Sequence, residues 1–135
     1  MANSLYDKGR QKFLEGSLVW LTDNIKIVLV DNGQYTVNLA THEFLSDIAS
    51  GARTATSGNF ASKTSTAGVA DAADITFTAV TGVQSESLVI YKDTGTASTS
   101  PLIAYIDTAT GLPVTPNGGD INVVFDNGAN RIFKL

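Results

Sequence analysis

Cysteine is absent from this chain of 135 residues, and histidine and tryptophan occur once each. The lack of cysteine excludes disulfides, cysteine-ligated zinc and thiol catalysis. A chain of this length buries about two-thirds of its unfolded surface on folding, so its core needs neither a disulfide nor a metal. We therefore expect a single packed domain that requires no cofactor.

Charge is also sparse, at 16% of residues where about 25% is usual, and the net charge is −4. Lysine and arginine are scattered, with one small cluster at Lys8, Arg10 and Lys12. Because nucleic-acid-binding proteins carry a basic stripe, we expect no nucleic-acid partner. No run approaches the ~18 apolar residues of a membrane span and no signal peptide is recognisable, so no membrane partner is expected.

Motifs for catalysis and for phosphate or metal binding are missing. The single histidine, His42, stands beside Glu43 without a nucleophile elbow, and neither glycine-rich phosphate-binding pattern occurs. Asp71 and Asp74 lie in an oxygen-rich segment of the kind that binds calcium, but the EF-hand spacing is absent and turn formation accounts for these acids. We therefore expect a protein that is not an enzyme, with calcium binding by a loop left open as an alternative.

One helix is predicted at the N-terminus, from Ser4 to Glu15. Ser4 is the expected N-cap, Asp7 follows at the capping-box spacing, and Gly16 is suited to end the helix. Two interpretations remain for this segment. It is either a helix docked on the sheet or an arm that reaches a neighbouring subunit.

The rest of the chain is dominated by short apolar runs between turn residues. The run 25–30 is almost wholly apolar, as in a strand covered on both faces. Asp-Asn-Gly at 31–33 and at 126–128 predicts tight turns. About eight strands are predicted, at 18–21, 25–30, 53–56, 75–80, 88–92, 102–106, 121–125 and 131–135.

The pattern predicts a mainly β fold: an antiparallel β-sandwich or jelly roll with a short N-terminal helix. We divide it into an N-terminal helix or arm at 1–16 and a single β-sandwich domain at 17–135. Residues 35–39 form a short strand or an extended loop, and 41–48 form one or two helical turns. Residues 57–68 are expected to be a long loop, functional or mobile.

Several segments together resemble small structural proteins of tailed bacteriophages. They are 4–16, Trp20, 23–31, 35–48, 85–95 and 100–107, which cover nearly the full chain. The resemblance implies a virion protein made in the host cytoplasm. The preferred role is a head decoration (cement) protein on the outer capsid surface, bound to the major capsid protein and assembled as a homodimer or homotrimer. A tail or baseplate component and a carbohydrate-binding module for host attachment are the alternatives.

Contacts in such a role depend on a buried patch of about 800 Å² per partner with a few dominant anchors. Many weak sites then act together through avidity. We expect these contacts in the N-terminal segment and in the segment 51–68. The candidate interface residues are Leu5, Tyr6, Arg10, Phe13, Arg53, Phe60 and Lys63. Trp20 is interpreted as a core residue.

Overall fold

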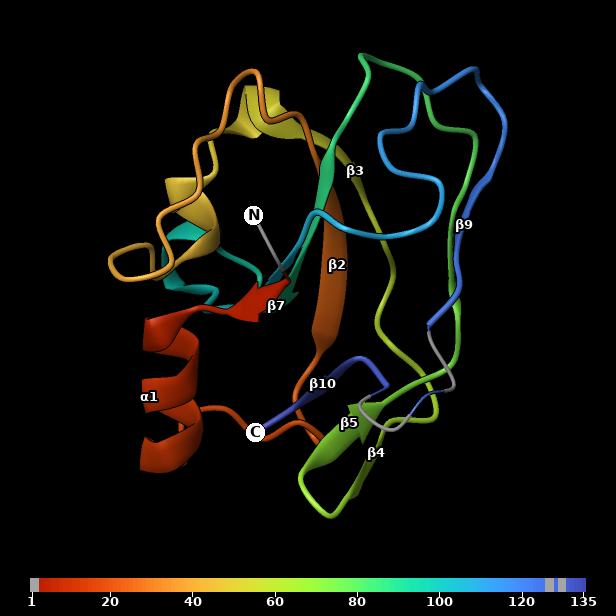
Figure 1. Ribbon diagram of the computed structural model, residues 1–135. Helices are drawn as coiled ribbons and strands as arrows, with labels where there is room; N and C mark the ends of the chain where they lie inside the picture. Colours follow the sequence, from red (N-terminus) through yellow and green to blue (C-terminus); the bar gives the residue numbers. More distant parts are fainter. Residues whose placement is uncertain (1–2, 126–127, 129–130) are drawn as a thin grey trace.

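The computed structural model describes residues 3–125, 128 and 131–135, and its fold is mainly antiparallel β-sheet with one α-helix near the N-terminus (Figure 1). This confirms the mainly β, sandwich-like fold class. The turn predicted at Asp126-Asn127-Gly128 lies largely outside the described residues. The elements are β1 (Ser4–Leu5), α1 (Asp7–Glu15), β2 (Ile25–Val30), β3 (Arg53–Thr56), β4 (Thr64–Thr66), β5 (Val69–Asp71), β6 (Ile75–Phe77), β7 (Ser87–Lys92), β8 (Leu102–Ile106), β9 (Ile121–Val123) and β10 (Phe133–Lys134), with 3₁₀ turns at Leu45–Asp47, Ser50–Ala52 and Ala97–Thr99.

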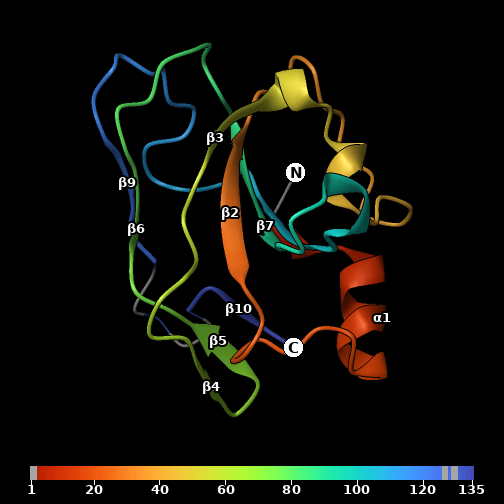
Figure 2. The same ribbon diagram turned by 180° about the vertical axis from the view of Figure 1, so that it is seen from behind.

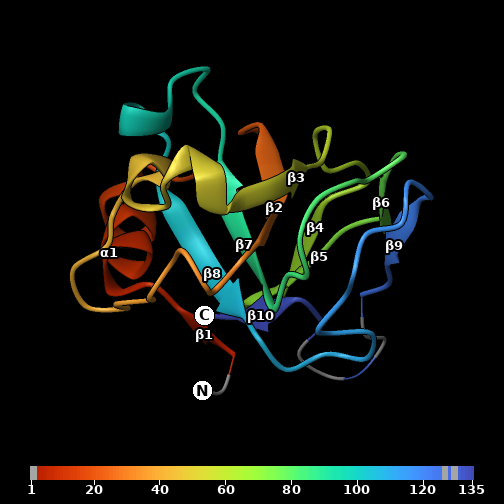
Figure 3. The ribbon, with the colours of Figure 1, turned by 90° about the horizontal axis from the view of Figure 1, so that it is seen from above.

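The strands form a central sheet and two smaller ones. The five-stranded sheet has the order β1-β8-β7-β2-β3, the three-stranded sheet β10-β5-β4 and the two-stranded sheet β6-β9. Helix α1 and the segment 31–52 cover one face of the five-stranded sheet, and the smaller sheets lie on its other side (Figures 1 and 2). The view from above shows the same arrangement of layers (Figure 3).

The five-stranded sheet is buried on both faces, because successive side chains of a strand point to opposite sides. In β2, Ile25, Ile27 and Leu29 enter a larger core that faces the small sheets. Val28 and Val30 enter a second core under the segment 31–52. The prediction that the apolar run 25–30 is covered on both faces is therefore confirmed.

The N-terminal helix begins at Asp7 and not at Ser4. Ser4 and Leu5 pair with Tyr105 and Ala104 of β8, so tertiary strand pairing replaces the predicted cap. The end of the helix is as predicted, since Gly16 adopts the left-handed conformation at φ 78° and its N–H donates to the last turn.

This N-terminal segment is part of the domain and not an arm beside it. Leu5 lies in the larger core and the next residue, Tyr6, lies in the second core. A segment that fills both cores cannot leave the domain without exposing them.

The outcome of the other local predictions is mixed. Residues 18–21 are not a strand, since Leu18 and Val19 have no regular structure and Trp20 and Leu21 lie in a turn, whereas 35–39 have no strand conformation and agree with the extended-loop alternative. The expected long loop at 57–68 contains β4, which forms a hairpin with β5. The helical turn within 41–48 is a 3₁₀ turn at Leu45–Asp47, while Phe44 forms a bridge with Pro101.

Candidate interaction surface

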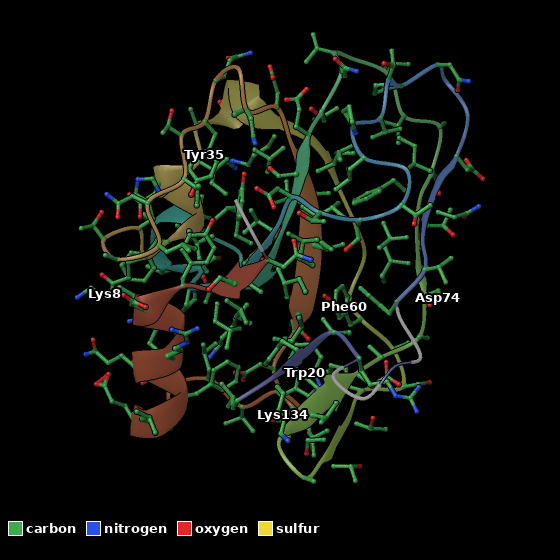
Figure 4. The ribbon with its side chains drawn as sticks, in the orientation of Figure 1. Lys8, Trp20, Tyr35, Phe60, Asp74 and Lys134 are labelled. Carbon is green, nitrogen blue, oxygen red and sulfur yellow. The ribbon has the colours of Figure 1, made fainter. Side chains whose placement is uncertain are left out.

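An exposed apolar groove lies around Trp20, and we call it the Trp20 groove. It has a volume of about 290 Å³ and is formed by α1, the turn that follows it, the β4–β5 hairpin and the C-terminal residues. Trp20, Phe60 and Lys134 are labelled in this part of the molecule in Figure 4. The lining residues are Phe13, Leu18, Val19, Trp20, Leu21, Ser65, Gly68, Ala70, Phe133 and Leu135.

One wall is a turn whose residues alternate between the core and solvent. Leu18 and Trp20 are buried, whereas Val19 is 45% exposed and Leu21 52% exposed. The Trp20 ring packs edge-on against Phe60 and Phe133, with ring centroids 6.0 and 5.3 Å away. Its Nε1 donates to the carbonyl oxygen of Thr64 at 3.1 Å, so the ring anchors the turn on the hairpin.

Asp23 holds the same turn in place. Its Oδ2 accepts the Val19 N–H at 2.7 Å and pairs with Lys92 Nζ at 3.4 Å. Lys63 Nζ donates to the Asp23 carbonyl oxygen. Burial lowers the pKa of Lys63, an effect that the charge of Asp23 opposes. Contacts from two distant parts of the chain thus fix the exposed Val19 and Leu21 in one conformation.

The floor of the groove is the inner face of the β10-β5-β4 sheet. Ala70 is buried there, and Phe133 stacks at a tilt against Phe13 of α1 with centroids 6.1 Å apart. Leu135 continues this wall and is 61% exposed. The surface is therefore mainly apolar and is built from the helix, the turn, the hairpin and the C-terminal residues.

Of the seven candidate interface residues, Phe13 lines the groove and Lys63 braces its wall. Leu5, Tyr6 and Phe60 are buried in the chain's own cores and offer no outward surface. These apolar residues of a terminal segment and a loop pack within the chain in this structure, and their contacts with a partner stay a prediction.

The two arginines lie elsewhere. Arg10 is exposed on α1, where its Nη1 pairs with Asp7 at 3.4 Å. Arg53 is half-buried and its Nε donates to the Ile48 carbonyl oxygen at 2.9 Å, so it fastens the 3₁₀ turns to β3. Neither arginine lines the Trp20 groove.

Sequence reasoning missed the exposed residues Val19, Leu21 and Leu135. Because they are apolar, they were assigned to predicted strands. In the turn at 18–21, buried and exposed residues alternate as they would in a strand. The available signal was the Thr-Asp-Asn sequence directly after Leu21, which marks a turn and not a strand continuation.

Buried polar groups form internal networks. Tyr35 OH contacts Tyr6 OH at 2.9 Å and His42 Nδ1 at 2.8 Å. Burial raises the pKa of Tyr35 to about 12 and raises the pKa of Tyr6 further. His42 Nδ1 also accepts the Asn38 N–H at 3.3 Å, so His42 orders the segment 31–52 as a local hydrogen-bond partner.

Across the described ranges, each buried side-chain nitrogen or oxygen has a hydrogen-bond partner. The same residues contain no group of three or more histidine, aspartate or glutamate side chains placed to hold a metal ion. No described helix is both long and apolar enough to cross a membrane. Comparison with models of known families and with curated proteins gave no match for this chain.

Proposed function

We propose that this protein is a structural component of a tailed-bacteriophage virion, a decoration protein that binds the outer capsid shell. The resemblance of its sequence segments to phage structural proteins suggests the setting. The Trp20 groove is the observation that supports an assembly role, because it presents apolar side chains outward on a braced turn. The partner is the major capsid protein, and the chain supplies contact surface and shape.

Rigidity makes the groove suited to binding. Val19 and Leu21 are held by Trp20, Asp23 and Lys63, so little conformational entropy remains to be lost on association. Covering the exposed half of a valine or leucine side chain contributes about 1 kcal/mol. Such a modest gain at one site becomes firm attachment when many copies act on one shell.

The test is cosedimentation of the purified protein with emptied phage heads. Leu21→Asp places a charge in the groove, and we expect it to reduce the bound fraction at least tenfold. Val83→Asp is the matched control, since Val83 is 53% exposed in the loop before β7 and does not line the groove. Equal binding by the two variants would remove the groove from the proposal.

A tail or baseplate component would use the same kind of surface. Its copy number per virion separates the two roles, because a shell protein is present in numbers comparable with the major capsid protein and a tail protein in few copies. Cosedimentation with isolated tails but not with heads would replace the decoration role by the tail role.

Carbohydrate binding has less support in the geometry. Sugar-binding sites stack the ligand on an open aromatic face. Trp20 is 6% exposed, and its ring packs against Phe60 and Phe133. A specific hit on a glycan array would restore this alternative.

A further inference from the structure

We propose that His42 is a pH-sensitive switch, and that protonation of its Nδ1 loosens residues 35–42 from the N-terminal segment. These residues, the His42 loop, contain neither a strand nor a helix. Tyr35, labelled in Figure 4, places one end of the loop in the second core. The carbonyl oxygen of Leu39 accepts the N–H of Asp7, at the start of α1, at 2.8 Å. The loop therefore closes on the N-terminal segment through a few polar contacts.

The hydrogen bonds of the loop determine the protonation state of His42. A backbone N–H can only donate, and the Asn38 N–H lies 3.3 Å from His42 Nδ1. Nδ1 therefore carries a lone pair, and the ring is neutral with its proton on Nε2. The Tyr35 hydroxyl is 2.8 Å from the same nitrogen and must also donate to it. One nitrogen atom thus accepts hydrogen bonds from two groups of the loop.

The same reasoning gives the two tyrosine hydroxyls a direction. Tyr35 has one hydroxyl hydrogen, which it donates to His42, so it can only accept at its 2.9 Å contact with Tyr6. Tyr6 is fully buried and is the donor of that bond. The hydrogen bonds therefore run from Tyr6 through Tyr35 to His42, from the second core to the loop.

A proton on Nδ1 is incompatible with this arrangement. The Asn38 N–H then faces another hydrogen, and Tyr35 has to accept from the ring and donate to Tyr6. The Tyr6 hydroxyl has no other hydrogen-bond partner among the described residues, so its hydrogen would be left without an acceptor. An unsatisfied buried hydroxyl is unfavourable, and we therefore expect the charged ring to leave its place and the loop to loosen.

Asp47, on the same covering segment, is the carboxylate that acts on His42. Its Oδ2 accepts the N–H groups of Glu43 and Phe44 at 2.7 and 3.0 Å. Burial acts to raise the pKa of Asp47, but these two bonds and the charge of His42 hold that pKa below its ordinary value of 3.8. Asp47 therefore stays ionised in mild acid and attracts the imidazolium. This attraction does not replace the acceptor that the Asn38 N–H loses.

The other facing groups come from α1 and β8. Lys12 of α1 pairs with Glu43 at 2.8 Å, so the two opposite charges largely cancel next to the loop. Tyr105 of β8 acts on both tyrosines of the chain of hydroxyls. Its own hydroxyl accepts the side-chain amide of Asn32 at 2.8 Å.

Mild acid therefore acts on this network through the histidine. Burial raises the pKa of Tyr35 to about 12 and raises the pKa of Tyr6 further, so neither hydroxyl ionises near neutral pH. Histidine is the side chain whose charge ordinarily changes between about pH 5 and 8. Because the closed loop requires neutral His42, closure should persist above this range and weaken as the pH falls through it.

Amide hydrogen exchange measured by NMR at about pH 7.5 and about pH 5, corrected for the intrinsic effect of pH on exchange, tests the switch. We expect the protection of the Asp7 amide, which bonds to Leu39, to fall about tenfold in acid. The Tyr6 amide is the matched reference, because it bonds to Ile103 of β8 and not to the loop, and its protection should stay within about twofold.

His42→Asn is the matched variant. The asparagine Oδ1 can stand where Nδ1 does, accepts the same two hydrogen bonds and does not titrate, so the acid response at Asp7 should disappear. The ring nitrogen chemical shifts of wild-type His42 report its tautomer, and we expect the proton on Nε2 at neutral pH.

Four results would overturn the proposal. They are a neutral ring with its proton on Nδ1, protection of the Asp7 amide that does not change with pH, an equal loss at Asp7 and Tyr6, and an acid response that His42→Asn retains. If that variant does not fold, Tyr35→Phe decides, because it removes the hydroxyl that protonation would turn around. Its loss of protection should shrink to less than about threefold, and an undiminished loss would contradict the switch. Binding to emptied heads does not enter this test, so the decoration role stands or falls separately.

Discussion

The hydroxyl of Tyr35 connects the N-terminal segment to the segment that covers the second core. It lies between Tyr6 OH and His42 Nδ1, and both tyrosine side chains are buried. A buried hydroxyl that loses its partner costs about 1–3 kcal/mol, whereas removing both partners of a pair costs less than the sum. A double-mutant cycle therefore measures the coupling free energy between the two tyrosine hydroxyls.

We expect Tyr35→Phe to lower the free energy of unfolding by about 1–3 kcal/mol. The double variant Tyr6→Phe with Tyr35→Phe should lose less than the two single variants added together. Urea unfolding followed by circular dichroism measures all three. Tyr91→Phe serves as the control for loss of a hydroxyl, and strict additivity of the tyrosine pair would contradict the coupling.

The folding stability of the protein depends on pH through Asp93. Its hydrogen bond from Lys26 Nζ at 2.9 Å and the Gly95 N–H at 3.0 Å hold the pKa of Asp93 below its ordinary value of 3.8, against the effect of burial. Because the folded-state pKa is the lower one, the unfolded chain takes up the proton first as pH falls. The stabilisation is complete above 3.8 and is lost as pH falls through the folded-state pKa.

Asp93→Asn should therefore destabilise the protein at neutral pH, by no more than about 1 kcal/mol for a partly exposed pair. The difference from wild type should vanish in acid. Urea titrations at stepwise lower pH measure it, and Lys26→Met should shift the curve in the same direction. A difference that persists unchanged in acid would show that Asp93 acts through packing and not through its charge.

At the scale of elements, Gly9 sets how closely α1 approaches β8. A Cβ built at Gly9 would lie 2.6 Å from the Leu102 carbonyl oxygen and 3.2 Å from Ile103 Cα, both backbone atoms. Alanine normally favours a helix over glycine by about 1 kcal/mol. Here the contact with backbone outweighs that preference, because neither element can move without disturbing a core.

Gly9→Ala is expected to destabilise the protein by about 1–3 kcal/mol, the usual range for overpacking. The midpoint of thermal unfolding should fall accordingly. Gly58→Ala is the control, since a Cβ there meets open space. It should be neutral or slightly stabilising, and an equal loss in both variants would argue against the close approach.

Most strands were predictable. The predicted strands at 53–56, 75–80, 121–125 and 131–135 contain β3, β6, β9 and β10, whereas β1, β4 and β5 were missed. β2, β7 and β8 were predicted correctly, because burial on both faces requires long apolar runs and such runs are recognisable in the sequence. β4 and β5 were missed because an exposed Thr-Ser-Thr strand has no apolar alternation, and the Ala67-Gly68 turn lacks the usual Asn-Gly pair. The start of α1 was misplaced because pairing of Ser4 with β8 is a long-range contact.

The Trp20 groove was predictable only in part, for a related reason. Phe13 and Lys63 were candidate residues from the sequence and lie at the groove, while Val19 and Leu21 were assigned to a strand. Their exposure depends on Lys63 and Lys92, which reach Asp23 from distant points of the chain. Local pattern cannot reveal a conformation that such contacts impose.

At the scale of the whole molecule, β1 unites the two cores. Leu5 belongs to the larger core and Tyr6 to the second, and the strand closes one edge of the central sheet. Deleting residues 1–6 should therefore abolish cooperative unfolding, with loss of the near-UV circular dichroism signal and a reduced or absent calorimetric transition. A truncated chain that still unfolds in one sharp transition would restore the interpretation of this segment as a detachable arm.

The cover on both faces of the central sheet separates the residues that form the cores from those exposed around the Trp20 groove. With the segment 31–52 on one side and the small sheets on the other, the apolar side chains of β2 and β7 are shielded from solvent, while Lys26 and Lys92 of these strands remain partly exposed. Val19, Leu21 and Leu135 can thus change in evolution with little effect on the interior. Relatives of this protein are expected to share the apolar pattern of β2, β7 and β8 while diverging in the exposed residues around Trp20.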